Sequence, residues 1–249
     1  MLLLLPPSEG KALGGAGPPL DLAGLSFSSL ASVRRTLVAA VVRLARRQPA
    51  ALRAALGLSE RQRGEVGDNA ALRTSATLPA IERYTGVVYD QLGYASLPAA
   101  ARHRADETLL VSSALFGLLR PTDSIPRYRL PAGTALPGLP ALAALWRPAL
   151  EPVLAGTGGL VVDLRSGAYA SLARMPTAIQ VRVLRDVDGH RTVVSHDNKY
   201  TKGRLARQLL LHGAQTVADV AAAGREVADA VELEGSRLDL VLRGLASAR

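Results

Sequence analysis

Short apolar runs that stop at dense polar segments constrain the fold of this chain more than any other feature of its sequence. The clearest case spans 111–130, VSSALFGLLRPTDSIPRYRL. Its apolar, β-branched beginning predicts an internal strand over 108–113, and 114–119 predicts a helical turn that ends where a proline forces Arg120 into an extended conformation. Asp123 then lies among three arginines, either as a functional carboxylate or as half of a structural ion pair that holds the loop.

The beginning of the chain has the same make-up. Leu2 to Leu5 predicts a buried strand that delivers Ser8, Glu9 and Lys11 into a glycine-rich loop. This loop is not a Walker loop, because the Gly-x4-Gly-Lys-Ser/Thr spacing is missing. Ser8 and Lys11 also lack the companion motifs of penicillin-binding enzymes, so their spacing by itself carries little information.

Two later segments repeat the pattern. The segment 160–169, LVVDLRSGAY, predicts a strand with Asp163 and Tyr169 at its carboxyl end, where α/β sheets place their sites. After a predicted hairpin over 179–195, the segment 195–204 predicts the start of a helix that Asp197 or Asn198 can cap. The cations of this helix start are Lys199, Lys202 and Arg204.

Lysine is rare in this chain. Of 30 basic residues only three are lysines, Lys11, Lys199 and Lys202. A lysine offers what arginine does not, namely a compact charge, a titratable amine or a Schiff-base nucleophile. Lys199 and Lys202 are predicted on the first turn of their helix, where the helix dipole disfavours a cation unless an anion is also held there. We therefore expect both to be functional, with a pKa lowered by crowded positive charge or with a bound phosphate or carboxylate.

A helical region near the amino terminus carries many arginines. Ser29 to Arg47 predicts an amphipathic helix whose arginines occupy solvated faces. The segment 51–66 predicts two short helices around Gly57-Leu58-Ser59, which is similar to a helix-hairpin-helix that presents backbone N–H groups to a DNA phosphate. Because Ser59 replaces the second glycine of that motif, an ordinary helical corner is the alternative. The arginines beside this turn are Arg53, Arg61 and Arg63.

Composition excludes several classes of site. The chain has no cysteine, which rules out disulfides, zinc-thiolate sites, iron–sulfur clusters and thiol nucleophiles. The histidines have no carboxylate partner in a ligand pattern, so no metal site and no cofactor are predicted. A net charge of +9 favours polyanionic partners such as nucleic acid or phosphorylated ligands.

Length and hydropathy indicate one cytoplasmic domain. The chain has 249 residues and no segment that reads as a linker, so a single domain over 1–249 is expected. The apolar run at Met1 to Leu5 stops at Pro6 and lacks the basic flank of a signal peptide. No stretch approaches the roughly 18 apolar residues of a membrane span, so no membrane partner is expected. The oligomeric state is left open.

Taken in order, five segments resemble the YaaA peroxide-stress family: LLPPSEGK, RYTGVVYDQL, SALFGLLRPTDSIPRYRL, VVDLRSGAY and SHDNKYTKGRLAR. The resemblance runs nearly from Leu2 to the end of the chain. It implies an α+β (mixed α/β) fold, a central mixed sheet wrapped by helices, with a basic cleft and a helix-hairpin-helix-like element. The best-known members have Ser-Pro-Ala-Lys-Thr in the first motif. Lys11 therefore corresponds approximately to the lysine of that motif, whereas Glu9 has no counterpart in it. The region of Lys199 and 202–204 corresponds more securely to family residues.

Two functions follow from the motifs and the resemblance. The first, which the resemblance implies, is a stress protein that limits free-iron damage and binds double-stranded DNA without sequence preference. Its anion-binding residues would be Arg53, Arg61, Arg63, Arg120, Arg129 and Arg204. The second is an enzyme for a small anionic or nucleotide-like substrate, because the motifs mix acids, bases and anion-binding groups. Its candidate residues are Ser8, Glu9, Lys11, Asp123, Asp163, Tyr169, Lys199 and Lys202. In either case we expect the five segments to converge on one basic cleft at the edge of the sheet.

Overall fold

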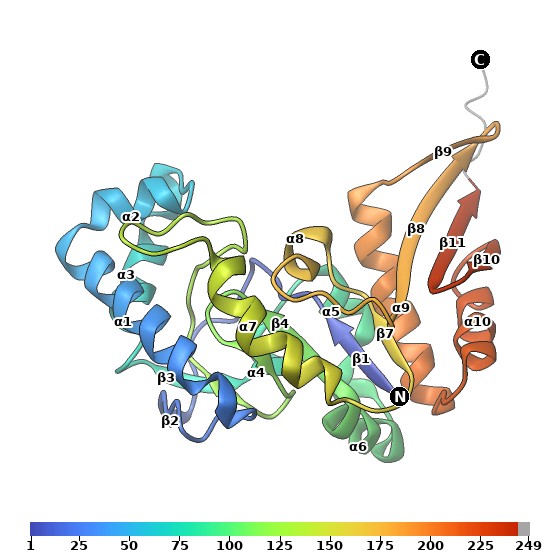
Figure 1. The fold of residues 1–249 in the computed structure, drawn as a ribbon, viewed down its shortest axis with the longest axis horizontal. Helices are drawn as coiled ribbons and strands as arrows, with labels where there is room; N and C mark the ends of the chain where they lie inside the picture. Colours follow the sequence, from blue (N-terminus) through green and yellow to red (C-terminus); the bar gives the residue numbers. More distant parts are fainter. Residues whose placement is uncertain (244–249) are drawn as a thin grey trace.

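The structure is a computed structural model that describes residues 1–243. Its main sheet has the strand order β10-β11-β8-β7-β1-β4-β5, with β9 paired to β8 beside this order (Figure 1). These strands are β1 (Leu2–Leu5), β4 (Leu109–Ser113), β5 (Gly117–Leu119), β7 (Val161–Asp163), β8 (Ile179–Val187), β9 (His190–Thr192), β10 (Ala230–Glu234) and β11 (Arg237–Arg243). A small second sheet has the order β2-β3-β6, formed by β2 (Gly17–Pro19), β3 (Ala76–Pro79) and β6 (Ser124–Ile125).

The centre of the main sheet is parallel. β1 pairs in parallel with both β4 and β7, and β8 pairs in parallel with both β7 and β11. Parallel strands that helices cover on both faces have nearly continuous apolar sequences. The four leucines of β1 fit this rule, since Leu3, Leu4 and Leu5 are fully buried. The hairpins β4–β5, β8–β9 and β10–β11 are antiparallel, so the predicted mixed α/β fold with a mixed sheet is confirmed.

Helices surround the sheet and extend beyond it at one end. The helices are α1 (Ala31–Arg47), α2 (Pro49–Ala55), α3 (Gly64–Ala70), α4 (Ala80–Arg83), α5 (Val87–Leu92), α6 (Ala99–Thr108), α7 (Leu142–Ala155), α8 (Gly167–Ala170), α9 (Ser195–His212) and α10 (Val217–Arg225). We call residues 31–73, which contain α1, α2, α3 and the short 3₁₀ helix η2 (Glu60–Gln62), the helical arm. The helical arm lies at the opposite end of the molecule from α9 and α10 (Figure 1). No helix among residues 1–243 combines the length and the apolar character that crossing a membrane requires.

The predicted helical turn over 114–119 is right only for 114–116, which form a turn, because 117–119 form strand β5. Gly117 has φ +77°, a left-handed conformation that glycine adopts without strain. A Cβ at this position would also lie 2.7 Å from the ring of Trp146. The indole N–H of Trp146 donates to the carbonyl of Ala114 at 2.8 Å, so α7 holds the turn from outside.

Arg34 also departs from its prediction. Instead of lying on a solvated face of α1 it is fully buried, and its guanidinium donates to the carbonyls of Phe116 at 2.9 Å and Leu118 at 2.8 Å. Phe116 lies in the turn before β5 and Leu118 lies in β5, an edge strand of the main sheet, and buried carbonyls there need a donor. Arg34 therefore serves the core of the fold.

The helix-hairpin-helix-like element stays a prediction. Gly57 follows α2 with φ +63°, as expected for a turn that only glycine adopts easily. The chain then passes through η2 before α3 begins at Gly64, so the two α-helices are joined by an additional short helix.

Gly203 brings α9 against α5. A Cβ on Gly203 would lie 2.5 Å from the carbonyl oxygen of Val88, which is backbone and cannot move aside easily. We expect Gly203→Ala to lower the free energy of unfolding by about 1–3 kcal/mol, the usual effect of overpacking.

The matched control is Gly67→Ala, in α3, where an added Cβ meets nothing within 4 Å. This change should raise the free energy of unfolding by about 0.5–1 kcal/mol, because alanine fits a helix better than glycine. Urea denaturation of both variants measures the difference. Equal effects at the two positions would show that the contact between α5 and α9 tolerates an extra carbon.

Candidate functional site

A cavity of 440 Å³ lies where the chain leaves β1 and β7, between α5 and the start of α9. Its walls come from four of the five motif segments, within 6–10, 85–89, 164–169 and 198–202. Because β1 and β7 are parallel, their carboxyl ends meet at the same edge of the sheet, which is where α/β folds place ligands. The volume falls in the range of small-molecule sites.

The structure brings most of the predicted residues together here. Those that line the cavity are Ser8, Glu9, Tyr169, Lys199 and Lys202. Lys11 and Arg129 line a hollow of 10 Å³ that shares Ser8, Glu9 and Tyr169 with the cavity. Through Arg129 the fifth motif segment also reaches the site.

Other predicted residues lie elsewhere. Asp123 lines neither hollow; its carboxylate accepts hydrogen bonds from the backbone N–H and hydroxyl of Ser26 at 2.9 Å and from the N–H of Arg120 at 2.8 Å. It therefore holds a loop, although through N–H and hydroxyl donors and not through the expected ion pair. The side chain of Arg120 donates to the carbonyl of Glu107, and that of Arg204 donates to the carbonyl of Glu226. Arg53, Arg61 and Arg63 belong to the helical arm.

Lys11 has an unusual environment for a cation. Its amine donates to the carbonyls of Ser8 at 3.1 Å and Glu9 at 3.4 Å, and it lies 4.3 Å from the centre of the Tyr128 ring. Burial lowers the pKa of Lys11 to about 7, and the positive charge of Arg129 contributes to this lowering. Near neutral pH this amine is therefore close to half protonated.

The hydroxyl of Tyr128 belongs to a chain of hydrogen-bonded hydroxyl groups that the motifs did not predict. The hydroxyl of Tyr128 lies 2.7 Å from those of Tyr84 and Ser113. Ser113 also accepts the backbone N–H groups of Leu115 and Phe116, so its own hydrogen is available for Tyr128. Burial raises the pKa of Tyr128, which keeps the ring neutral beside Lys11. One signal was available in the sequence, since all tyrosines except Tyr94 lie in the five motif segments.

Lys202 is the second buried amine. It is 6% exposed, and its Nζ donates to the carbonyl of Arg165 at 3.3 Å. Burial lowers the pKa of Lys202 to about 8, while the negative charge of Asp163 opposes this change. The expected cause, crowding with Lys199, is wrong because desolvation is the cause here.

The start of α9 also differs from its prediction. The helix begins at Ser195 with Val194 as its N-cap, so Asp197 and Asn198 lie inside it and do not cap it. Lys199 and Lys202 consequently lie beyond the first turn. Lys199 is exposed and lines the cavity, which puts it at the mouth.

Asp163 lies behind the cavity wall in a closed pair. Its two carboxylate oxygens accept hydrogen bonds from Nε of Arg165 at 2.9 Å and from Nη2 of Arg165 at 2.7 Å. Asp163 is 3% exposed and Arg165 is 6% exposed. Arg165, which was not among the predicted site residues, thus satisfies the charge of Asp163 completely. The pair supports the wall from which Ser166 and Tyr169 line the cavity.

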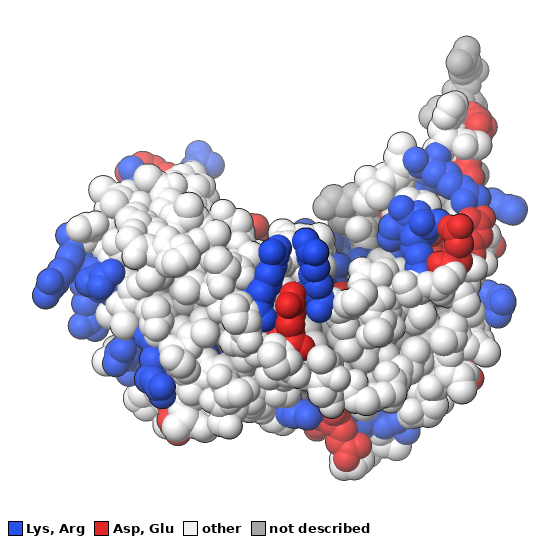
Figure 2. Space-filling view, in the orientation of Figure 1, with Lys and Arg blue, Asp and Glu red and all other residues white. Residues whose placement is uncertain are grey.

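Basic residues are distributed unevenly over the surface. The helical arm holds nine arginines and three carboxylates. Figure 2 shows Lys and Arg atoms gathered at the left end of the molecule, over α1 to α3, whereas the groups farther right include acidic atoms. The cavity has fewer charges, namely Glu9, Lys199 and Lys202. The predicted basic cleft at the motif residues stays a prediction.

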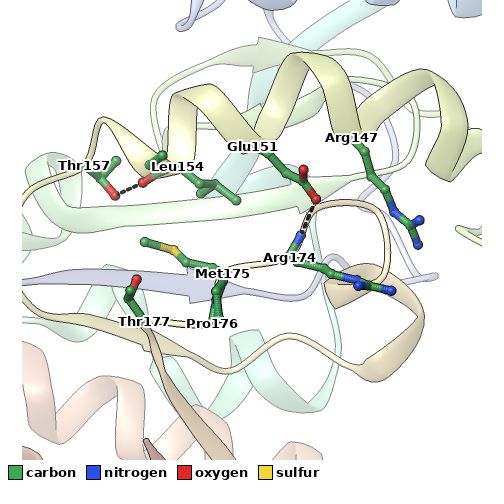
Figure 3. Close-up of a pocket in the computed structure, with 9 residues that line it drawn as sticks. Arg147, Glu151, Leu154, Thr157, Arg174, Met175, Pro176 and Thr177 are labelled. Carbon is green, nitrogen blue, oxygen red and sulfur yellow. Dashed lines mark hydrogen bonds between the residues drawn. The ribbon is translucent and has the colours of Figure 1, made fainter.

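A larger hollow of 630 Å³ lies between α7 and the segment 174–177 (Figure 3). None of the predicted site residues lines it. Its carboxylate, Glu151, accepts the backbone N–H of Arg174 at 3.3 Å, which ties the segment to the helix. We therefore take the smaller cavity as the candidate site. Within residues 1–243 no group of three or more His, Asp or Glu side chains is arranged to hold a metal ion.

Comparison with known proteins agrees with the motifs. The family described as "Peroxide stress protein YaaA" matches residues 1–227. A UPF0246 protein of Corynebacterium efficiens is 44% identical over 97% of this chain and 99% of its own length. A UPF0246 protein of Streptomyces coelicolor is 46% identical over 94% of this chain and 93% of its own length. With matches of this extent, the chain belongs to the YaaA peroxide stress family.

Proposed function

We propose that this chain is an enzyme that acts on a small anionic substrate in the cavity, and that its reaction serves the response to peroxide. The observation that carries the proposal is the presence of two desolvated amines at one site, that of half-buried Lys11 and that of buried Lys202, with pKa values lowered to about 7 and about 8. Titratable groups with strongly shifted pKa values in a cavity are typical of catalytic sites. Binding DNA through charge alone needs no such groups.

The surrounding side chains suit distinct roles. Lys11, about half protonated at neutral pH, can accept or return a proton. Tyr169 lines both hollows, and burial raises its pKa to about 12, so its hydroxyl remains a proton donor. Lys199 at the mouth supplies positive charge for an anionic group of the substrate. Ser8 and Glu9 form the opposite wall, with Glu9 held by Arg129 at 3.0 Å.

The test is survival of peroxide in a bacterial strain that lacks its own family member and carries this chain. Lys11→Arg and Lys202→Arg keep a positive charge and remove a titratable amine, so both should abolish protection at unchanged protein levels. Lys199→Arg keeps the charge at the mouth and should protect in part. Arg225→Lys, an exposed change on α10, should protect fully. Full protection by both Lys11→Arg and Lys202→Arg would reject the enzyme proposal.

The same strain tests the effect on iron. The resemblance implies that family members limit damage by free iron, and we propose this as the cellular result of the reaction. Intracellular free iron, measured by electron paramagnetic resonance, should fall with the wild-type chain and stay high with Lys202→Arg. Protection without any change in free iron would contradict the iron role and leave the reaction itself in place.

Binding to double-stranded DNA is the second candidate function, and the charge of the helical arm favours it. Two of its three carboxylates are engaged from outside the arm, since Arg129 pairs with Glu65 and Arg127 pairs with Asp68. The third, Glu60, pairs with Arg53. Arg61 and Arg63 are exposed and have no carboxylate partner among residues 1–243, so both can reach phosphates.

These pairs predict unequal contributions to DNA affinity. Replacing Arg61 and Arg63 with glutamine should reduce the slope of log affinity against log salt by about 0.9 for each phosphate that the variant no longer neutralises. Arg53→Gln should change the slope less, because Glu60 already balances its charge. Fluorescence anisotropy with a labelled duplex at several salt concentrations measures this, with Arg225→Gln as the control. Absence of binding at low salt, or an unchanged slope in the double variant, would reject a role of the arm in DNA binding.

A further inference from the structure

Half-buried Lys11 and buried Lys202 differ in what can reach their amines. The hollow beside Lys11 has a volume of 10 Å³, which is about the space that one water molecule needs. The amine of Lys11 is also engaged by the carbonyls of Ser8 and Glu9. A substrate carbon therefore cannot approach Lys11, although a proton can pass through one water molecule. Lys202 lines the 440 Å³ cavity directly.

The amine of Lys202 is free to react. Among residues 1–243 it forms no salt bridge, because the nearby Asp163 is fully engaged by Arg165. Its contact with the carbonyl of Arg165 is long, at 3.3 Å, and leaves other directions open. With its pKa lowered to about 8, Lys202 at neutral pH has on the order of a hundred times more neutral amine than a lysine at the ordinary value of 10.5. Only the neutral amine is a nucleophile.

The cavity walls favour loss of water from a reacting group. Val88 and Leu164 contribute apolar wall beside Lys202. Tyr89 presents its ring, because its hydroxyl donates to the carbonyl of Pro6 at 2.8 Å. Such a wall holds few competing waters, and an amine that condenses with a carbonyl must release one water.

The mouth of the cavity indicates the charge of the ligand. Glu9 lies 3.0 Å from Arg129, which also pairs with Glu65 at 3.4 Å, so the charge of Glu9 is only partly compensated. Lys199 has no carboxylate partner among residues 1–243 and is exposed to solvent. A small molecule that enters therefore meets the ammonium group of Lys199 at the mouth and the amine of Lys202 farther inside.

We propose that Lys202 forms a Schiff base with a small carbonyl compound that carries an anionic group, which Lys199 binds at the mouth; this rests on the enzyme function proposed above. The lone pair of Nζ attacks the carbonyl carbon and forms a C–N bond, while the carbonyl π electrons move to oxygen. A proton passes from nitrogen to that oxygen, directly or through Tyr169. The resulting hydroxyl takes up a second proton from solvent and leaves as water, while the nitrogen lone pair forms the C=N bond of a protonated Schiff base. Oxidant and reductant are not required for this condensation.

The experiment traps this bond in the purified full chain. The protein is incubated with sodium pyruvate, treated with sodium borohydride and mapped by peptide mass spectrometry. The expected product is one reduced adduct on Lys202, with little on Lys199 or Lys11. Three lysines in the whole chain make this assignment simple. The yield of the adduct should rise as the pH passes from 6.5 toward 8, because the neutral fraction of Lys202, whose pKa is about 8, increases over this range.

Two comparisons test the ligand class. Acetone, a carbonyl without an anionic group, should give a several-fold lower yield at equal concentration, and lactate, an anion without a carbonyl, should give no adduct. Lys199→Gln should remove the preference for pyruvate over acetone and leave trapping by acetone in place. Lys202→Arg should remove the adduct altogether.

Absence of an adduct on Lys202 at high pyruvate concentration, or labelling of the three lysines in order of their exposure, would overturn the inference. The peroxide-survival assay separates this failure from that of the proposed function. If Lys202→Arg loses protection and no adduct forms, the cavity is catalytic without a Schiff base. If Lys11→Arg and Lys202→Arg both protect fully and no adduct forms, both proposals fail.

Discussion

Asp163→Asn is expected to lower the free energy of unfolding by about 3–5 kcal/mol, the usual result of breaking a buried ion pair from one side. Asp163 and Arg165 are 3% and 6% exposed, and three donors of Arg165, the backbone N–H, Nε and Nη2, point to the two oxygens of Asp163. An asparagine cannot accept all of them, and it leaves the guanidinium charge buried without compensation. Urea denaturation at pH 7 measures the loss.

An exposed pair provides the control. Glu60→Gln removes the partner of Arg53, whose side chain is 36% exposed against 69% for Glu60. The change should alter the free energy of unfolding by less than about 1 kcal/mol, because water already solvates both charges. Similar small effects at Asp163 and Glu60 would mean that water reaches the Arg165 pair.

The same variant has a consequence at the candidate site. The negative charge of Asp163 raises the pKa of Lys202 against the larger lowering by burial. In Asp163→Asn the pKa of Lys202 should therefore fall below its present value of about 8. The pH at which pyruvate trapping reaches half of its maximum reports this shift, provided that the variant is assayed below its unfolding temperature.

The position of the candidate site could be predicted from the sequence because strand ends are visible in it. Leu2–Leu5 and Val161–Asp163 are apolar runs of a few residues that stop at polar segments, and such runs in a mixed α/β chain become parallel strands. Parallel strands share one carboxyl edge, so the segments after them must meet. This local rule was sufficient to bring Ser8 and Tyr169 to one cavity.

The partners of individual charges could not be predicted, because they depend on contacts between distant segments. Asp123 is surrounded by arginines in sequence, yet its side chain accepts from Ser26, 97 positions away. Arg34 follows the helical pattern of a solvated residue and is buried by carbonyls of 116–118, more than 80 positions away. Periodicity describes one element at a time and carries no information about an unpaired carbonyl elsewhere.

The lysines show where composition helped and where it misled. Their rarity pointed to functional amines, and two of the three have a lowered pKa at the candidate site. The expected cause of a lowered pKa, repulsion between neighbours one turn apart, did not account for Lys202. The burial of Lys202 depends on how closely α9 packs against the rest of the protein. Gly203 permits this packing, because it allows α9 to approach Val88 of α5.

Lys202→Met is expected to make the fold more stable at neutral pH. It should also abolish the part of the pH dependence of the free energy of unfolding that Lys202 causes. The pKa of Lys202 is about 8 in the folded protein and 10.5 for an ordinary lysine. Between these values the unfolded chain binds more protons than the folded chain, so the free energy of unfolding rises with pH. Below pH 8 the unfavourable contribution of Lys202 is fully present, at about 3 kcal/mol. Methionine has a similar shape and no charge, so Lys202→Met should recover much of this amount at pH 7 and little at pH 10.5.

Urea denaturation between pH 6.5 and pH 10.5 measures both curves, and Lys199→Met is the matched control. Lys199 is exposed on the same helix, so its replacement controls for the exchange of a lysine for a methionine on α9. Lys11 contributes a similar rise of the free energy of unfolding above about pH 7 in all three proteins, so this contribution cancels in the comparison. Parallel curves for wild type and Lys202→Met would contradict the lowered pKa. A more stable Lys202→Met protein that fails to protect against peroxide would instead identify Lys202 as a residue that lowers stability and is required for function, as expected of a buried catalytic amine.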